Sequence, residues 1–199
     1  AYEGFEELSA MIYDRAGLTV KPYLLSDRDA VIETICAREA HITSLQAIPY
    51  LVAAENGCAD AALVARRLGD IVYNSQIFVN VESGIETLSM LKDETFCRPD
   101  ENSTTGWIIP KLSLKAAGIN PENDFYYILD TGSHNATVEY VYGYECTAGA
   151  TYVDAREAVS AQIPDVMDII QVISVSPDIP NDGVQFHPDL DPDVRDLLV

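Results

Sequence analysis

Helix-like and strand-like segments alternate along almost the whole of this 199-residue chain. Residues 5–15 carry apolar side chains at helical spacing and end at Gly17, and Asp27 is a candidate N-cap for a helix over 28–38. Strands separated by helices of this length are typical of parallel βαβ crossovers and therefore of a three-layer α/β fold. The predicted helices are 5–15, 28–38, 49–57, 85–91, 105–117, 133–142 and 155–162, and the predicted strands are 18–25, 40–45, 61–65, 73–79, 95–97, 125–129, 147–153 and 169–175.

Two lobes, each a mainly parallel sheet flanked by helices, fit this length better than one sheet that holds every strand. We expect residues 1–80 to begin the first lobe, 81–175 to form the second, and 176–199 to return to the first. The crossings are placed near 78–82 and 174–178, where the chain is extended and carries polar residues or proline. Ligands of doubly wound sheets bind beyond the carboxyl ends of the strands, so two lobes can share one cleft.

The charge balance narrows the possible partners. The chain has 12 Lys and Arg against 32 Asp and Glu, for a formal net charge of -20, while 48% of its residues are hydrophobic. The apolar fraction is sufficient for a folded core, but the negative field would repel nucleic acid and anionic membranes. No apolar run approaches the roughly 20 residues of a membrane span. The start at Ala1 has no basic or apolar leader, so we expect any export signal to be removed or absent.

Four cysteines, Cys36, Cys58, Cys97 and Cys146, lack the spacing of a zinc site. We expect no metal and no other cofactor. Without knowledge of the compartment, buried free thiols are favoured over disulfides, which stay open as the alternative.

Three successive hydroxyl residues, Ser103, Thr104 and Thr105, stand between a predicted strand and a predicted helix. At a helix N-terminus they add O–H donors to the free backbone N–H groups and the positive end of the helix dipole. Gly106 next to them permits close approach of the backbone. This pattern indicates an anion site, and the alternative is an ordinary Ser or Thr N-cap, which needs one hydroxyl only.

A second polar turn, Thr131-Gly132-Ser133-His134-Asn135, also joins a strand to a helix. Ser133 is a natural N-cap, and His134 in the first helical turn could donate a hydrogen bond to an oxyanion. A surface histidine is the alternative. Both turns belong to the same predicted lobe and should open on the same sheet edge. Neither turn contains Lys or Arg, so neutral donors would hold the anion.

Two aspartates, Asp154 and Asp182, each follow a predicted strand and could face the cleft. A carboxylate there could accept a proton from a ligand P–OH group or pair with a ligand ammonium group. The alternatives are a helix N-cap for Asp154 and a turn residue for Asp182. A hydrolase with Ser103, His134 and Asp154 as nucleophile, base and orienting acid is a further alternative, although no G-x-S-x-G elbow is present.

Taken together, these segments resemble the substrate-binding proteins of phosphate, phosphite and phosphonate ABC transporters over nearly the whole chain. The segments that carry the resemblance are 96–100, 103–110, 132–136, 148–156 and 176–182. The resemblance implies the type 2 periplasmic-binding fold, in which two lobes close on an oxyanion of phosphorus. Thr105 stands where serine is common in the family.

The resemblance also implies a set of ligand-binding residues. In the family the three hydroxyls grip the phosphoryl oxygens, a tyrosine and the turn histidine add donors, and two later acidic residues contact the amino group of aminophosphonates. The matching positions here are Tyr73, Ser103, Thr104, Thr105, His134, Asp154 and Asp182.

The function expected from this resemblance is capture of a phosphonate, phosphite or phosphate outside the cytoplasm and its delivery to an ABC permease of the inner membrane. We expect a non-catalytic monomer in the periplasm or at the extracellular face of the cell membrane, with lipid anchoring left open. A sensor domain of the same fold is the alternative. The chain begins almost at the first helix and stops at Val199, so we expect a truncated or minimal form of the fold.

Overall fold

The computed structural model describes residues 2–22, 24–25, 28–67 and 69–199. The chain divides into two compact units, the first made of Ala1–Ile71 and Pro180–Val199 and the second of Val72–Ile179. The second unit therefore begins before the predicted residue 81 and ends after the predicted residue 175. The reason is that β4 (Ser75–Asn80) lies wholly in the sheet of the second unit.

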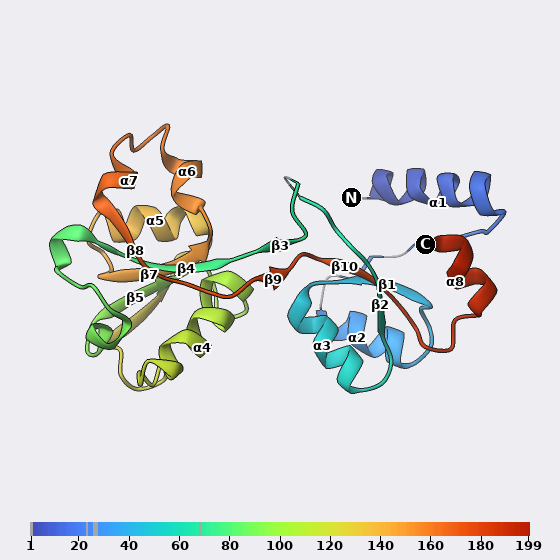
Figure 1. The fold of residues 1–199 in the computed structure, drawn as a ribbon, viewed down its shortest axis with the longest axis horizontal. Coiled ribbons are helices and arrows are strands. Elements are labelled where there is room, and N and C mark those ends of the chain that lie inside the picture. Colours follow the sequence, from blue (N-terminus) through green and yellow to red (C-terminus); the bar gives the residue numbers. More distant parts are fainter. Residues whose placement is uncertain (1, 23, 26–27, 68) are drawn as a thin grey trace. The chain divides into compact units, whose positions relative to one another are not determined.

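The first unit is built on a three-stranded sheet in the order β1-β10-β2 (Figure 1). Its strands are β1 (Ile42–Leu45), β2 (Asp60–Val64) and β10 (Gly183–Phe186), and its helices are α1 (Tyr2–Ala16), α2 (Arg28–Cys36), α3 (Ala47–Glu55) and α8 (Pro192–Leu198). Ile35, Leu45, Ala53 and Ala59 form its buried core. This core brings α2 and α3 onto the sheet.

The predicted strand over 18–25 is wrong for the described residues 18–22 and 24–25, which have no regular secondary structure. Pro22 cannot donate a ladder hydrogen bond, which disfavours this segment as a strand. Its apolar side chains instead line a pocket of about 300 Å³ together with α1 and β1. The predicted N-cap Asp27 lies outside the described residues.

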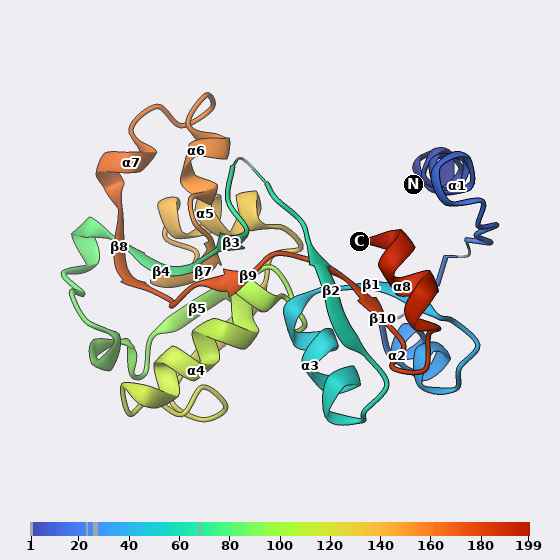
Figure 2. The same ribbon diagram turned by 45° about the vertical axis from the view of Figure 1, so that its right-hand side comes forward.

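The second unit holds a five-stranded sheet in the order β6-β5-β7-β4-β8 (Figure 2). The strands other than β4 are β5 (Thr95–Arg98), β6 (Tyr127–Asp130), β7 (Ala148–Tyr152) and β8 (Ile170–Val175). Its helical segments are η1 (Val81–Ser83), η2 (Leu88–Leu91), η3 (Thr104–Ile108), α4 (Ile109–Ala116), α5 (His134–Tyr142), α6 (Ala155–Val159) and α7 (Val166–Ile169).

Both faces of this sheet are buried, as a three-layer fold requires. Ile77 and Phe96 point to the face where Trp107 and Leu114 pack. The alternate residues Phe78 and Cys97 point to the other face, which α5 covers. The three-layer architecture expected from the alternation of elements is therefore confirmed for this unit.

The α/β class is confirmed, but mainly parallel sheets were expected, whereas the sheet of the second unit is mixed and the sheet of the first unit has antiparallel pairs. β5 runs parallel to β6 and β7, whereas β4 is antiparallel to β7 and β8, and β10 is antiparallel to β1 and β2. β2 leads the chain out of the first unit and β10 brings it back, so these neighbours run in opposite directions. β4 and β8 enter and leave the second unit in the same way. The short strands β3 (Val72–Tyr73) and β9 (Ile179–Pro180) pair where the chain passes between units.

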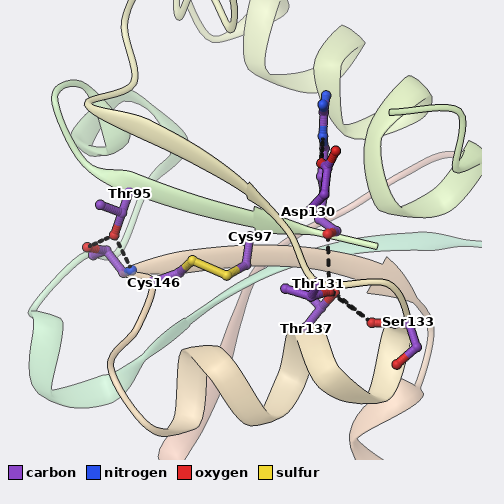
Figure 3. The surroundings of a disulfide bond; sticks show 9 residues. Thr95, Cys97, Asp130, Thr131, Ser133, Thr137 and Cys146 are labelled. Carbon is purple, nitrogen blue, oxygen red and sulfur yellow. Dashed lines mark hydrogen bonds and ion pairs between the residues drawn. A yellow bond between two sulfur atoms is a disulfide. The ribbon is translucent and has the colours of Figure 1, made fainter. Parts of the chain in front are cut away.

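All four cysteines are paired, so the preference for free thiols was wrong. The disulfides are Cys36–Cys58 and Cys97–Cys146, with Cα–Cα distances of 4.9 and 5.8 Å. Cys97 lies on β5, and its disulfide with Cys146 is buried between the sheet and α5 (Figure 3). In the part of the chain that the structure describes, no helix has both the length and the apolar character needed to cross a bilayer.

Candidate functional site

Three loops of the second unit open on one edge of its sheet, because each follows one of the parallel strands β5, β6 and β7. The loop after β5 carries Ser103, Thr104 and Thr105, the loop after β6 leads to His134, and the loop after β7 carries Asp154. The sequence expectation that the hydroxyl turn and the histidine turn share an edge therefore agrees with the strand directions.

The hydroxyl turn begins a helix that starts as η3 and continues as α4. Ser103 is its N-cap, and its Oγ accepts a hydrogen bond from the N–H of Gly106 at 3.1 Å. Within the described residues, the hydroxyl and backbone N–H groups of Thr104 and Thr105 have no hydrogen-bond partner, although these residues are only 9% and 5% exposed. The turn thus presents unpaired donors at a positive helix end.

The backbone of this turn is held from two sides. Ser75 at the start of β4 donates its hydroxyl to the carbonyl oxygen of Thr105 at 2.7 Å. A Cβ atom built on Gly106 would lie 2.3 Å from Cδ of Pro99, so the turn needs glycine for this close approach. Ser75 was not predicted, because a serine within a buried strand carries no sequence signal for such a contact.

His134 is the first residue of α5, after the N-cap Ser133, whose Oγ accepts from the N–H of Ala136 at 3.1 Å. Its ring meets Tyr152 edge-on, with the ring centroids 4.9 Å apart. Burial lowers the pKa of His134, and the nearby charge of Asp100 opposes this shift with a smaller effect. The imidazole is therefore held in its neutral form over a wider pH range than an exposed histidine.

We assign the proton of the neutral ring to Nε2. Nδ1 of His134 is buried and has no hydrogen-bond partner among the described residues. A proton on Nδ1 would be a buried donor without an acceptor, which is costly. The ring can then act as an N–H donor through Nε2 without carrying a charge.

Two threonines, Thr131 and Thr137, hold the turn that leads to His134 (Figure 3). Oγ1 of Thr131 lies 2.7 Å from Oγ1 of Thr137 and 3.1 Å from the carbonyl oxygens of Arg98 and Ser133. Thr137 is fully buried and also donates to Ser133 at 3.0 Å. Thr131 belongs to the polar turn identified in the sequence. Nothing in the sequence distinguishes Thr137 from other residues of an amphipathic helix.

Asp154 is the N-cap of α6, as the structural alternative expected. Its Oδ1 accepts from the backbone N–H of Arg156 and from Nε2 of Gln76, each at 3.0 Å, and the Arg156 guanidinium pairs with both carboxylate oxygens. Burial alone would raise the pKa of Asp154, but the hydrogen bonds from Arg156 and Gln76 outweigh it and lower the pKa.

Tyr73 and Asp182 complete the predicted set. Tyr73 lies on β3, and the next residue, Asn74, accepts a backbone hydrogen bond from Val153 at 2.9 Å, which puts this strand beside the loop after β7. Asp182 belongs to the first unit, where its carboxylate forms an ion pair with Arg67. The structure thus gathers six of the seven predicted residues in the second unit, whereas Asp182 belongs to the first.

The side chains that the structure describes contain no group of three or more His, Cys, Asp or Glu that could hold a metal ion. The donors at the sheet edge are hydroxyl, amide and imidazole groups, which suit an anion.

Comparison with protein families and comparison with curated proteins both find similarity to periplasmic phosphonate-binding proteins. A family model described as the periplasmic substrate-binding protein of phosphonate ABC transporters matches residues 1–199. The phosphonates-binding periplasmic protein of Escherichia coli (strain K12) is 24% identical over 190 residues, which are 92% of this chain and 56% of that protein. The chain thus spans little more than half the length of this curated relative.

Solved structures resemble the chain over nearly its whole length. PhnD1 of Prochlorococcus marinus in complex with methylphosphonate matches with a TM-score of 0.67 and 19% identity, covering 98% of this chain and 75% of that one. A binding component of a Pseudomonas aeruginosa ABC phosphonate transporter matches with a TM-score of 0.65 and 21% identity, over 98% and 66% of the two chains. A Xanthomonas citri protein bound to ATP reaches 0.78 at 18% identity, over 97% and 74%. These likenesses confirm the two-lobed α/β fold.

Proposed function

We propose a function from one premise: the chain belongs to the family of periplasmic substrate-binding proteins of phosphonate ABC transporters. The protein binds a phosphonate, or the related oxyanions phosphite and phosphate, outside the cytoplasm and delivers it to an ABC permease. It acts without catalysis, as a monomer.

The observation that supports this proposal is the set of unpaired donors at Thr104 and Thr105. A phosphonate presents oxygen atoms that accept hydrogen bonds, and two hydroxyls with two backbone N–H groups at a helix N-terminus match such a group. The neutral N–H of His134 and the hydroxyls of Ser103 and Tyr73 are the further donors we assign to the site. Neutral donors bind an anion through well-placed hydrogen bonds and need no positive charge. A chain of net charge -20 can therefore still hold an anion, because salt screens its more distant charges.

The same geometry favours binding over hydrolysis. A Ser-His-Asp triad needs the acid to orient the histidine, but Asp154 is bound to Arg156 and Gln76 instead. The oxygen of Ser103, the candidate nucleophile, already accepts the N–H of Gly106. These contacts suit a helix cap and leave the hydroxyl hydrogen of Ser103 for a ligand.

Isothermal titration of the 199-residue protein with methylphosphonate, phosphite and phosphate tests the proposal. One-site binding of at least one compound is expected, and Thr104→Val should weaken it by roughly 1–3 kcal/mol, the cost of leaving a buried partner unpaired. Thr87→Val is the matched control, because Thr87 is a surface residue of the same unit whose hydroxyl contacts Ser89. Folded protein that gives no heat with all three compounds would refute the proposal.

A further inference from the structure

We infer that the ligand is a phosphonate without an amino group, because the carboxylate predicted to hold an ammonium group, Asp154, is already bound by Arg156. This inference rests on the proposed function and narrows its substrate class. Arg156 is then the residue that determines specificity between alkylphosphonates and aminophosphonates. The sequence alone assigned no role to Arg156.

The pair between Asp154 and Arg156 is tight and largely buried. Nε of Arg156 lies 2.9 and 3.1 Å from the two carboxylate oxygens, Nη2 pairs with Oδ2, and each of the two side chains is 14% exposed. Nη1 of Arg156 donates to the carbonyl oxygen of Ile170 at 2.7 Å, which holds the guanidinium in place.

A ligand ammonium group would have to displace this guanidinium. Oδ1 of Asp154 already accepts from Gln76 and from the backbone N–H of Arg156, and Oδ2 accepts from the guanidinium. Displacement would leave a charged Arg156 without its partner in a largely buried place, which is unfavourable. An alkyl group of the ligand makes no such demand.

Two other aspartates near the predicted motifs are also in ion pairs with arginine and are therefore not free to bind a ligand ammonium group. Asp130 at the end of β6 is paired with Arg98 at 2.6 Å, and Asp182 of the first unit is paired with Arg67. Asp100 forms no ion pair within the described part of the chain, and its Oδ1 accepts the N–H of Asn102 at 2.8 Å. Asp178, within the segment 176–182, likewise forms no ion pair in the described part of the chain, and its Oδ1 accepts from Nδ2 of Asn74 at 3.0 Å. Asp100 and Asp178 are therefore further carboxylates that the experiment must include.

The test compares two ligands of the same shape, n-propylphosphonate and 2-aminoethylphosphonate, which differ by a methyl group in place of the ammonium group. Titration of the wild-type protein should give a Kd for n-propylphosphonate equal to or lower than that for 2-aminoethylphosphonate. Arg156→Met frees the carboxylate, so it should shift the ratio of the two Kd values toward the amino compound by about tenfold or more. Arg38→Met is the control, because it removes one positive charge from an exposed pair in the first unit and should leave the ratio unchanged.

A second variant keeps the test decisive if Arg156→Met does not fold. Asp154→Asn retains a good N-cap, and the ratio of the two Kd values should not change in it. Wild-type protein that prefers 2-aminoethylphosphonate by about tenfold or more, with the preference lost in Asp154→Asn, Asp182→Asn, Asp100→Asn or Asp178→Asn, would overturn the inference while leaving the proposed function standing. Folded protein that binds neither compound, nor methylphosphonate, phosphite or phosphate, would refute the proposed function itself.

Discussion

Removing the disulfide between Cys97 and Cys146 should lower the free energy of unfolding of the second unit by about 4 kcal/mol. The bond closes a loop with a sequence separation of 49 residues, and the loop-entropy relation gives about 4 kcal/mol at 25 °C for a loop of this length. For Cys36–Cys58, with a separation of 22, the same relation gives about 3 kcal/mol. Both estimates treat the disulfide as a constraint on the unfolded chain.

Urea denaturation of a Cys97→Ala/Cys146→Ala variant measures this effect. The single tryptophan of the chain, Trp107, is 5% exposed in the core of the second unit, so its fluorescence reports the unfolding of that unit. The variant should show a lower midpoint than the wild-type protein. Cys36→Ala/Cys58→Ala is the control, since that disulfide lies in the first unit and its loss should change the tryptophan transition less.

The result that would contradict this reasoning is a loss below about 1 kcal/mol in the Cys97→Ala/Cys146→Ala variant at an unchanged denaturant slope. The strands β5 and β7 would then be held by the sheet and by α5 alone, and the loop closed by the disulfide would already be ordered in the unfolded ensemble.

Three further predictions concern pH, salt and packing. Burial lowers the pKa of His134 below its ordinary value of 6.5, so at acidic pH the unfolded chain binds more protons than the folded protein. The free energy of unfolding should therefore fall as the pH falls below 6.5. Urea titrations at several pH values should show that His134→Gln lacks this part of the pH dependence. The association rate of an anionic ligand, followed by stopped-flow fluorescence, should rise with ionic strength, because salt screens repulsion by a chain of net charge -20; a rate that falls with salt would contradict this. Gly106→Ala should destabilise the protein by about 1–3 kcal/mol in thermal or urea unfolding, whereas Gly4→Ala, where a Cβ meets no atom within 4 Å, should not.

Much of the candidate site could be predicted because its signals are local. Ser103 and Ser133 are followed by the N–H groups that they cap, so the sequence alone indicates two helix starts with polar turns before them. Placing both turns on one edge needed only the rule that loops after parallel strands open on the same side. The assignment of these turns to ligand binding stays a prediction that the experiments above test.

The partners of the charged and polar side chains could not be predicted, because they come from distant parts of the chain. Gln76, which is far from Asp154 in sequence, donates to its carboxylate, and Ser75 fixes the carbonyl oxygen of Thr105. The pairing of the cysteines was missed for the same reason. Spacing along the chain cannot show that Cys97 and Cys146 are 5.8 Å apart at Cα.

The order of residues was enough to predict α1 to α6, most strands and the two polar turns, since periodicity and N-caps act over one or two helical turns. It did not predict α7, α8, β9 or β10. Tertiary packing alone decided the directions of β4 and β10, both disulfides and the contacts that occupy Asp154. These features depend on which segments meet in the folded chain. Such meetings are set by which remote segments bury apolar surface against each other, and the apolar periodicity of one segment does not identify its partner.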